Sequence, residues 1–289
     1  MIKTVLVHLR GTKGDAANLS AALQIARPFG AHLECLHVRP DWAGLIARVA
    51  PAGMDDDTDA ISKMMETVQK DSAESAHRAF DAFTRFCDDQ RIPRSELPVG
   101  SKELGASFRE DLGDELDRLI VQSRRHDLVV VKGGNAEDGG MGRDDVGRLV
   151  LSAGRPILLA PTVSARAIRI IAVAWKDAPE AARAVTAAMP ILENARRVFV
   201  MSASEDEEPK SDAPGVVTQL QWHGIDAEAH HVEPRGRDAH DAVLETARAM
   251  DADLLVAGAY GRSRLREVIF GGFTEGVLED ASLPVLLLH

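Results

Sequence analysis

The sequence predicts an α/β protein built from two similar halves, each a parallel sheet covered by helices on both faces. Short apolar runs of strand character alternate with helical segments along the whole chain, which is typical of βαβ units. The chain also repeats itself. "HDLVVVKGG" at 126–134 resembles "ADLLVAGAY" at 252–260, and each is followed by a similar run, "PILLAP" or "PVLLLH".

Two pairs of landmarks fix the size of this repeat. Asp127 and Asp253 are 126 residues apart, and Pro156 and Pro284 are 128 residues apart. The runs at 3–9 and 168–175 match in kind, since both are apolar and rich in β-forming residues. We therefore expect one domain over residues 1–162 and a second over residues 163–289, a division that suits a chain of 289 residues.

The elements of the second half follow from their patterns. Strands are expected at 168–175, 197–203 and 227–233, and in "DLLVAG" and "PVLLLH". Helices are expected at 178–195, 215–224 and 238–250, the last with Asp238 as its N-cap. Because connections between parallel strands are right-handed, this order predicts a doubly wound sheet.

The first half is longer because of the segment at 41–90. From Asp57 onward this segment reads as one long helix with a ragged apolar face, made of Met64, Met65, Val68, Ala76, Phe80, Phe83 and Phe86. This face either packs on the core of the first half or forms a groove or a partner surface.

Composition excludes several classes of protein. With 34 basic and 45 acidic residues the net charge is -11, whereas nonspecific nucleic-acid binding needs basic surface, so neither DNA nor RNA is an expected partner. No apolar run approaches the roughly 20 residues of a membrane span, and no secretory signal is recognisable at the start. Cys35 and Cys87 show no metal spacing or disulfide framework, and Cys35 is expected to be buried. A cytoplasmic location is the simplest expectation.

Glycines cluster near the end of the chain in "GAYGRSRLREVIFGGFTEG", residues 258–276. Ligands of open parallel sheets bind beyond the carboxyl ends of the strands, and Gly258 ends a strand at that edge. Gly271 and Gly272 open the next helix, whose free N–H groups suit a phosphate, and Thr274 adds a hydroxyl group. The alternative, that these glycines are only turn formers, stays open at this point.

The spacing Gly258, two residues, Gly261, nine residues, Gly271 resembles the C-terminal signature of universal stress protein domains. The whole chain resembles a tandem member of that family. The resemblance implies two Rossmann-like (adenine nucleotide alpha hydrolase-like) domains, each a five-stranded sheet of order 3-2-1-4-5. It also implies binding of ATP or AMP, with Mg²⁺ accompanying ATP, along 258–274. The residues implied there are Gly258, Gly261, Arg262, Ser263, Gly271, Gly272, Phe273 and Thr274.

The chain departs from the family pattern at two positions of the second half. Gly272 stands where the family's binders usually carry Ser or Thr, which removes one hydrogen bond to phosphate, worth about 0.5–3 kcal/mol. Lys176 stands where they carry an aspartate that contacts the nucleoside. The neighbouring Asp177 is either a substitute for that aspartate or, as we favour, the N-cap of the following helix. Lys176 is either a solvated surface charge or a phosphate contact.

Three further residues belong to the expected nucleotide site. Trp175 is either a stacking face for adenine or a core residue at the end of its strand. Ala174 and Ala203 fall at the ends of the first and second strands of this half, where the family's adenine pocket forms. Their small side chains suit a pocket and tight packing equally well.

The first half has lost the motif. Lys132 and Asn135 stand where Gly258 and Gly261 stand, and Arg10 replaces the family's aspartate. Acidic residues crowd the glycine-rich stretch that follows, and they would repel a phosphate. We therefore expect no nucleotide in the first half by the usual mode.

Neither a metal site nor a catalytic constellation is expected. His230 and His231 are adjacent on a predicted strand, so they point to opposite faces and do not easily share one ion. The resemblance implies a binding or regulatory protein with slow ATP hydrolysis at most. It also implies that "PILLAPT" and "PVLLLH" pair within the chain as a pseudo-dimer, and a homodimer of the whole chain is left open. The alternative function is an interaction module that binds no nucleotide.

Overall fold

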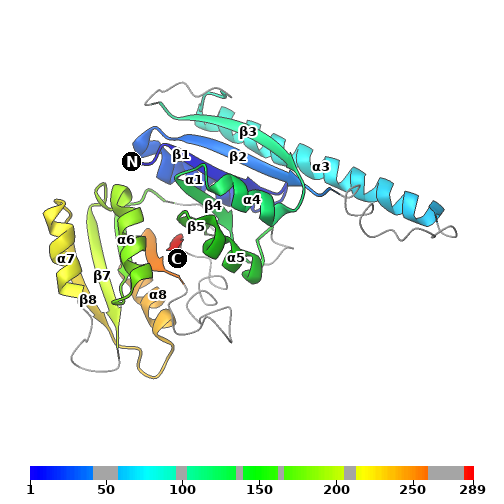
Figure 1. The fold of residues 1–289 in the computed structure, drawn as a ribbon. Coiled ribbons are helices and arrows are strands. Elements are labelled where there is room, and N and C mark those ends of the chain that lie inside the picture. Colours follow the sequence, from blue (N-terminus) through cyan, green and yellow to red (C-terminus); the bar gives the residue numbers. More distant parts are fainter. Residues whose placement is uncertain (42–57, 96–102, 135–138, 162–165, 205–212, 260–282) are drawn as a thin grey trace.

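The fold is one sheet of ten strands with helices on both faces (Figure 1). The computed structural model describes residues 1–41, 58–95, 103–134, 139–161, 166–204, 213–259 and 283–289, and the side chains of 58–64 lie outside the described part. The strand order is β3-β2-β1-β4-β5-β10-β9-β6-β7-β8. Read from its own first strand, each half therefore has the order 3-2-1-4-5, and this prediction is confirmed.

The strands of each half are short, and all except the outer strands β3 and β8 are mainly apolar. In the first half they are β1 (Thr4–Leu9), β2 (His32–Arg39), β3 (Gly105–Leu112), β4 (Leu128–Lys132) and β5 (Ile157–Ala160). In the second half they are β6 (Ile170–Ala174), β7 (Arg197–Ala203), β8 (Ala227–Val232), β9 (Leu254–Gly258) and β10 (Val285–Leu288). Within each half every pair of neighbouring strands is parallel. Parallel strands buried on both faces read as continuous apolar runs, as "LVVV" in β4 does.

The sheet separates the core into two layers of buried side chains, and helices cover each layer. On one face α1 (Asp15–Ala26), the short 3-10 turn η1 (Arg27–Phe29), α3 (Thr58–Gln90), α6 (Pro179–Leu192) and α7 (Ala213–Trp222) cover the sheet. On the other face lie α4 (Glu115–Ser123), α5 (Arg143–Ala153) and α8 (Ala239–Ala249). Each layer of buried side chains contains residues of both halves, so the two halves share their cores.

The two halves join through β5 and β10, which are the strands at the C-terminal end of each half. These strands pair antiparallel, with Leu158 opposite Leu286 and Ile157 opposite Leu287. The sequence predicts that these two segments pair, and they do. Because the pairing is antiparallel, the carboxyl edges of the two half-sheets point in opposite directions, so any site at one edge is remote from its counterpart.

The halves also repeat the same hydrogen bonds. Asp127 Oδ2 accepts from the backbone N–H groups of Lys3 (2.7 Å) and Thr4 (3.0 Å). Asp253 Oδ2 accepts from those of Arg169 and Ile170, both at 3.0 Å. Each carboxylate thus ties the start of the fourth strand of its half to the start of the first.

The long helix of the first half is α3, and Figure 1 shows its first part extending beyond the end of the sheet. Of its expected apolar face, Ala76 and Phe83 are buried in the core. Phe80 lies at the rim and is 46% exposed, with its ring 5.2 Å from that of Phe108 on β3 in an edge-on contact. Within the described part of this face, Ala76, Phe83 and Phe86 pack on the core, whereas Met65 and Val68 are only partly buried.

Two smaller expectations can also be compared with the structure. Cys35 is fully buried, as predicted, and burial raises the pKa of its thiol. Asp238 stands at the N-cap position of α8, although its side chain makes no capping hydrogen bond. Within the described parts of the chain, no helix is both long and apolar enough to cross a membrane.

Candidate nucleotide-binding edge

The candidate site of the second half lies where the carboxyl ends of β6 and β9 meet. These strands are neighbours, with Ala174 opposite Ala257. Within the sheet, β6 has β7 as its neighbour on one flank and β9 on the other. The chain continues from β6 to β7 and β8 and then returns to β9, so the strand order reverses between β6 and β9. Open α/β sheets bind ligands at such a switch point.

The structure brings six of the predicted residues to this edge. Ala174 ends β6, and Trp175, Lys176 and Asp177 follow it directly. Ala203 ends β7 and Gly258 ends β9. The other predicted residues, Gly261, Arg262, Ser263, Gly271, Gly272, Phe273 and Thr274, lie outside the described residues.

Gly258 has a structural role that the sequence did not indicate. A Cβ atom added at this position would lie 2.6 Å from the backbone nitrogen of Ala181 and 2.6 Å from the carbonyl carbon of Glu180. Real Cβ atoms do not approach other atoms so closely, so the glycine lets the first turn of α6 pack directly on the end of β9. Close helix packing therefore explains this glycine without a ligand.

Trp175 is held at the end of β6 rather than presented to solvent. Its backbone N–H donates to the carbonyl of Met201 at 2.8 Å, and its partly buried ring packs against the core layer under α6 and α7. Its indole Nε1 is buried and has no hydrogen-bond partner among the residues that the structure describes. Of the two roles expected from the sequence, this packing favours the core role.

The favoured role of Asp177 as the N-cap of α6 is wrong. The helix begins at Pro179, and its N-cap is Ala178, with no side-chain capping bond. Proline is preferred at the first helical position because it needs no N–H partner there, so it shifts the cap to the residue just before it. Asp177 is therefore an exposed residue in the turn between β6 and α6.

Lys176 is the exposed cation of this edge. It lies in the same turn, and no hydrogen bond or ion pair joins it to any other residue in the described part of the chain. Its ammonium group is thus available to an anion, as one of the two roles expected from the sequence requires.

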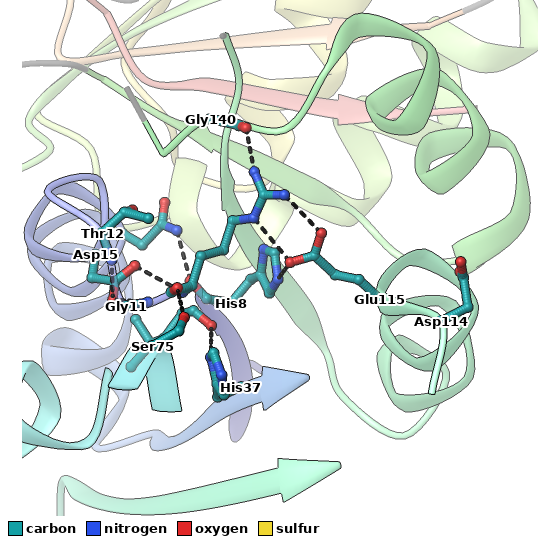
Figure 2. Close-up of polar contacts among 12 residues, drawn as sticks. His8, Gly11, Thr12, Asp15, His37, Ser75, Asp114, Glu115 and Gly140 are labelled. Atoms are coloured by element: carbon teal, nitrogen blue, oxygen red, sulfur yellow. Dashed lines mark hydrogen bonds and ion pairs between the residues drawn. The ribbon is translucent and has the colours of Figure 1, made fainter. Parts of the chain in front are cut away.

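The equivalent edge of the first half is filled by its own side chains (Figure 2). Arg10, which follows β1, donates from Nε and Nη2 to the two carboxylate oxygens of Glu115, both at 2.9 Å. The buried His8 places its Nε2 3.0 Å from the same carboxylate, and Arg10 also donates to the carbonyl of Gly140. Burial alone would raise the pKa of Glu115, but the hydrogen bond from His8 and the charge of Arg10 lower it to about 2.

A second carboxylate orders the turn after β1. Asp15 at the start of α1 is 2% exposed, and it accepts from the backbone N–H groups of Arg10 (2.9 Å), Gly11 (2.8 Å) and Thr12 (3.3 Å). Burial raises the pKa of Asp15, although these three donors oppose the shift. The backbone donors that face a ligand anion in other switch-point sites are here used by a side chain of the protein.

Helix α3 then covers this turn. Ser75 donates its hydroxyl to the carbonyl of Arg10 at 2.7 Å, and Arg78 Nε donates to the carbonyl of Gly11 at 2.9 Å. A Cβ on Gly11 would lie 2.1 Å from the carbonyl oxygen of Ser75, and the φ of Gly11 is +73°, so only glycine fits beneath the helix. Helix α3 and Arg10 therefore occupy this edge of the first half.

Sequence reasoning found Arg10 but missed Glu115, His8 and Ser75. Glu115 is 105 residues from Arg10 along the chain, and "GDELDRL" reads only as the start of a helix. A useful signal would have been His8, because a histidine within an apolar strand needs a polar partner when it is buried.

Two other clusters lie around the loop that joins β8 to α8, with members in the loop, in the end of β8 and in α8. Asp238, His240 and Asp241 have potential ligand atoms within 4.8 Å of one another, but both carboxylates are exposed and His240 already contacts Asp241 at 3.2 Å. A cavity of about 390 Å³ beside this loop is lined by His231, Val232, Glu233, Arg235, Arg237, Glu245, Thr246 and Ala249. Its arginines pair with its glutamates, Arg237 with Glu245 and Arg235 with Glu233. We assign no ligand to either cluster.

Comparison with known proteins identifies the second half. The model of the universal stress protein family matches residues 167–289. A universal stress protein from Methanocaldococcus jannaschii is 29% identical over 49 residues, which are 17% of this chain and 30% of that protein. The match therefore spans less than a third of this relative's length.

Solved structures match the fold of the whole chain. A universal stress protein from Archaeoglobus fulgidus has a TM-score of 0.63 at 16% identity, covering 99% of this chain and 95% of its own. A functionally unknown protein from Pseudomonas aeruginosa PAO1 has a TM-score of 0.56 at 16% identity, covering 99% and 92%. At this identity the likeness shows the fold alone, and it extends the α/β architecture over both halves. The sequence match to the universal stress protein family is thus confined to residues 167–289, less than half of the chain.

Proposed function

We propose that this chain binds an adenine nucleotide, ATP or AMP, at the carboxyl edge of its second half and acts as a binding or regulatory module of the stress response. The observation that carries the proposal is the contrast between the two edges. In the first half Arg10 is paired with Glu115 and α3 covers the turn, whereas in the second half Lys176 is exposed and has no such partner within the described residues.

The glycine frame of the sequence supports the same edge. It begins at Gly258, which ends β9 beside β6, so the segment that follows leaves the sheet at the switch point. Because helix packing alone explains Gly258, the sequence evidence for nucleotide binding comes from Gly261 and Gly271, which follow the family spacing.

We propose no catalytic role. Among the described residues of the turn that follows β6, the ionisable side chains are Lys176 and Asp177, and both are exposed; Glu180, in the first turn of α6, is buried. An activated base or nucleophile is held by a second group that tunes it, and neither residue has such a contact there. Hydrolysis of bound ATP, if measured, should therefore be slow.

Calorimetric titration of the purified chain with ATP and AMP tests the proposal. We expect saturable binding by the wild type and a loss of binding in a Gly261→Glu variant, because the new carboxylate repels phosphate. A Gly142→Glu variant is the control, since a Cβ at Gly142 meets no atom within 4 Å and the residue lies in the first half. No saturation at millimolar nucleotide would overturn the proposal.

The second candidate function is an interaction module that binds no nucleotide. One observation favours it: β5 and β10, the last strands of the two halves, pair with each other within the chain. Native mass spectrometry of the freshly purified protein separates the two candidates. A co-purifying adenylate supports the first, and a protein that is empty and stays empty with added nucleotide supports the second.

The proposed organisation is a tandem protein with domains at 1–162 and 163–289, located in the cytoplasm. The repeated strand order and the matched hydrogen bonds of Asp127 and Asp253 support the two-domain division. The residues around the boundary, 162–165, lie outside the described part of the chain.

A further inference from the structure

The two outer edges of the sheet differ in how they are covered. The outer strand of the first half is β3, and its Ala106 donates to the carbonyl of Pro93 and accepts from the N–H group of Ser95, both at 2.9 Å. Charged residues then fill positions 109–111 of the same strand. Both features hinder pairing with another chain, because they use the free backbone groups or surround them with charge.

The outer strand of the second half is β8, and its successive residues turn their backbone groups to opposite sides. The carbonyls of Asp226 and Val232 accept from the N–H groups of Val198 (2.8 Å) and Ser204 (3.3 Å), on the side of β7. The even-numbered residues of β8 therefore pair with β7. The residues whose N–H and C=O groups turn outward are Ala227, Ala229 and His231.

Most of these outward groups are open to a further strand. Gln221 donates its side-chain amide to the carbonyl of Ala227 at 3.2 Å. Across the ranges that the structure describes, no group meets the outward backbone groups of Ala229 or His231. The strand also contains neither lysine nor proline, the residues that commonly guard such an edge. An added strand could therefore extend the hydrogen-bond ladder of the sheet here.

An exposed aromatic side chain lies at the same edge. Trp222 is the last residue of α7 and is 85% exposed. Its neighbour Gln221 reaches the outer side of β8, so the last turn of α7 lies beside this edge. Figure 1 shows α7 and β8 together at the outer margin of the second half. A chain that pairs with β8 thus also meets a large apolar side chain.

The side chains of β8 favour a second copy of this chain as the partner. Two copies related by a two-fold axis pair antiparallel, with their outward-turned residues opposite one another. An axis at Glu228 would set this carboxylate against its own copy, and an axis at His230 would set it against Val232. An axis at Ala229 sets Glu228 of each copy opposite His230 of the other. This register is favourable, because a carboxylate accepts a hydrogen bond from an imidazole.

We propose that two copies of this chain associate through β8, antiparallel about a two-fold axis at Ala229, so that one sheet continues through both copies. At the axis the two Ala229 residues exchange both of their backbone hydrogen bonds. Glu228 is exposed and His230 is partly buried, and two contacts between them flank the axis on one face of the sheet. Trp222 of each copy lies beside the other copy. This association uses neither candidate nucleotide edge, so it does not rest on the proposed function.

Sedimentation equilibrium of the full chain at increasing concentration tests the proposal. We expect the mass to rise to twice the 31.2 kDa of one chain. In Ala229→Pro the lost N–H group points away from β7, so the chain keeps its own ladder while the dimer loses two hydrogen bonds. The dissociation constant of the dimer should rise by about tenfold or more. Glu110→Pro is the matched control on β3, where Ala106 shows that even-numbered residues turn outward, and it should leave the constant unchanged.

An exchange of charges tests the register, and it decides the question if the proline variant does not fold. Glu228→Lys alone should weaken the dimer because it removes the carboxylate. His230→Glu alone should also weaken it, because two carboxylates then face each other. The double variant that carries both changes should restore the dimer, since each new lysine faces a new glutamate. Circular dichroism checks that each variant folds.

Three results would overturn the proposal. The first is a wild-type chain that stays at 31.2 kDa at every concentration. The second is a dimer whose dissociation constant is unchanged in a folded Ala229→Pro variant, because another surface then joins the copies. The third is a double variant that associates as weakly as the single variants, because Glu228 and His230 then do not face each other.

Discussion

Arg10 and Glu115 are joined by two parallel hydrogen bonds of 2.9 Å at the carboxyl edge of the first half. This pair is a forked arrangement in which Nε and Nη2 of the guanidinium each donate to one carboxylate oxygen, the geometry that makes arginine–carboxylate contacts strong. It pairs the cation that follows the first strand of the first half, whereas the second half exposes the corresponding cation, Lys176. The two halves thus differ, within the described residues, in whether the cation after the first strand is paired.

The pH dependence of stability should show the contribution of Glu115. Its folded pKa of about 2 lies below the ordinary value of 4.5, so its ionised form stabilises the fold fully above about pH 4.5. That contribution is lost as the pH falls toward 2. Glu115→Gln should therefore lower stability at pH 7 by about 1–2 kcal/mol, an amount reduced for the partial exposure of the pair. Urea unfolding of both proteins from pH 7 to pH 3 should show the difference shrinking.

A control for this pH series is Glu110→Gln, which removes a carboxylate from an exposed pair with Arg39. Surface pairs contribute little, so this change should cost less than about 0.5 kcal/mol at pH 7. If Glu115→Gln behaves like the control, the paired carboxylate does not stabilise the closed edge.

Gly258 should tolerate no side chain. In Gly258→Ser the new Cβ would lie 2.6 Å from the backbone of Ala181, so α6 must shift, at a cost of about 1–3 kcal/mol. Gly142→Ser is the matched control, because it is the same substitution at a position where the added Cβ has no atom within 4 Å. Serine also suits the N-cap position of α5, which Gly142 occupies. Thermal unfolding should show a lower Tm for the first variant only. Equal Tm values for both would refute the close packing of α6 on β9.

The two repeated aspartates should be equally important. Asp127→Ala and Asp253→Ala each leave two backbone N–H groups without their acceptor, which should cost about 2–3 kcal/mol in either half. Asp226→Ala serves as the comparison, since that residue is 70% exposed and lies 3.7 Å from Arg197. Chemical denaturation measures all three. A large cost in one half with none in the other would argue against a repeated architecture.

The two halves should unfold together in a single transition, because they share a core at their junction. Leu286 on β10 is 1% exposed and pairs with Leu158 on β5, within a core layer that contains residues of both halves. Leu286→Ala should therefore lower stability by about 2–4 kcal/mol and leave a single transition. Scanning calorimetry measures the number of unfolding transitions. Two separate transitions, only one of which shifts in temperature in Leu286→Ala, would contradict the prediction.

Much of the fold could be predicted because its signals are local or repeated. Strands buried on both faces read as apolar runs, and the second copy of "DLLVA" after "DLVVV" reveals the repeat without any structure. The range 197–203 matches β7, and 227–233 differs from β8 by one residue. The N-cap of α6 is wrongly predicted at Asp177 because aspartate is a preferred N-cap residue. In the structure Pro179 is the first residue of the helix, so Ala178 is the N-cap.

The state of each edge could not be predicted, because it depends on contacts between distant residues. Nothing near Arg10 in the sequence indicates Glu115, and Ser75 reaches the carbonyl of Arg10 from a helix 65 residues away. Gly258 is a second case in which a contact between distant residues could not be predicted. Its sequence context suggested a ligand, while the atom that requires a glycine belongs to α6.

The number of nucleotides bound per chain tests the central claim most directly. Native mass spectrometry with saturating AMP should show one nucleotide on the wild type, one on Glu115→Ala and none on Gly261→Glu. That pattern places the nucleotide in the second half and leaves the first half empty. Two nucleotides per chain, or one that persists in Gly261→Glu and is lost in Glu115→Ala, would contradict the assignment of the two edges.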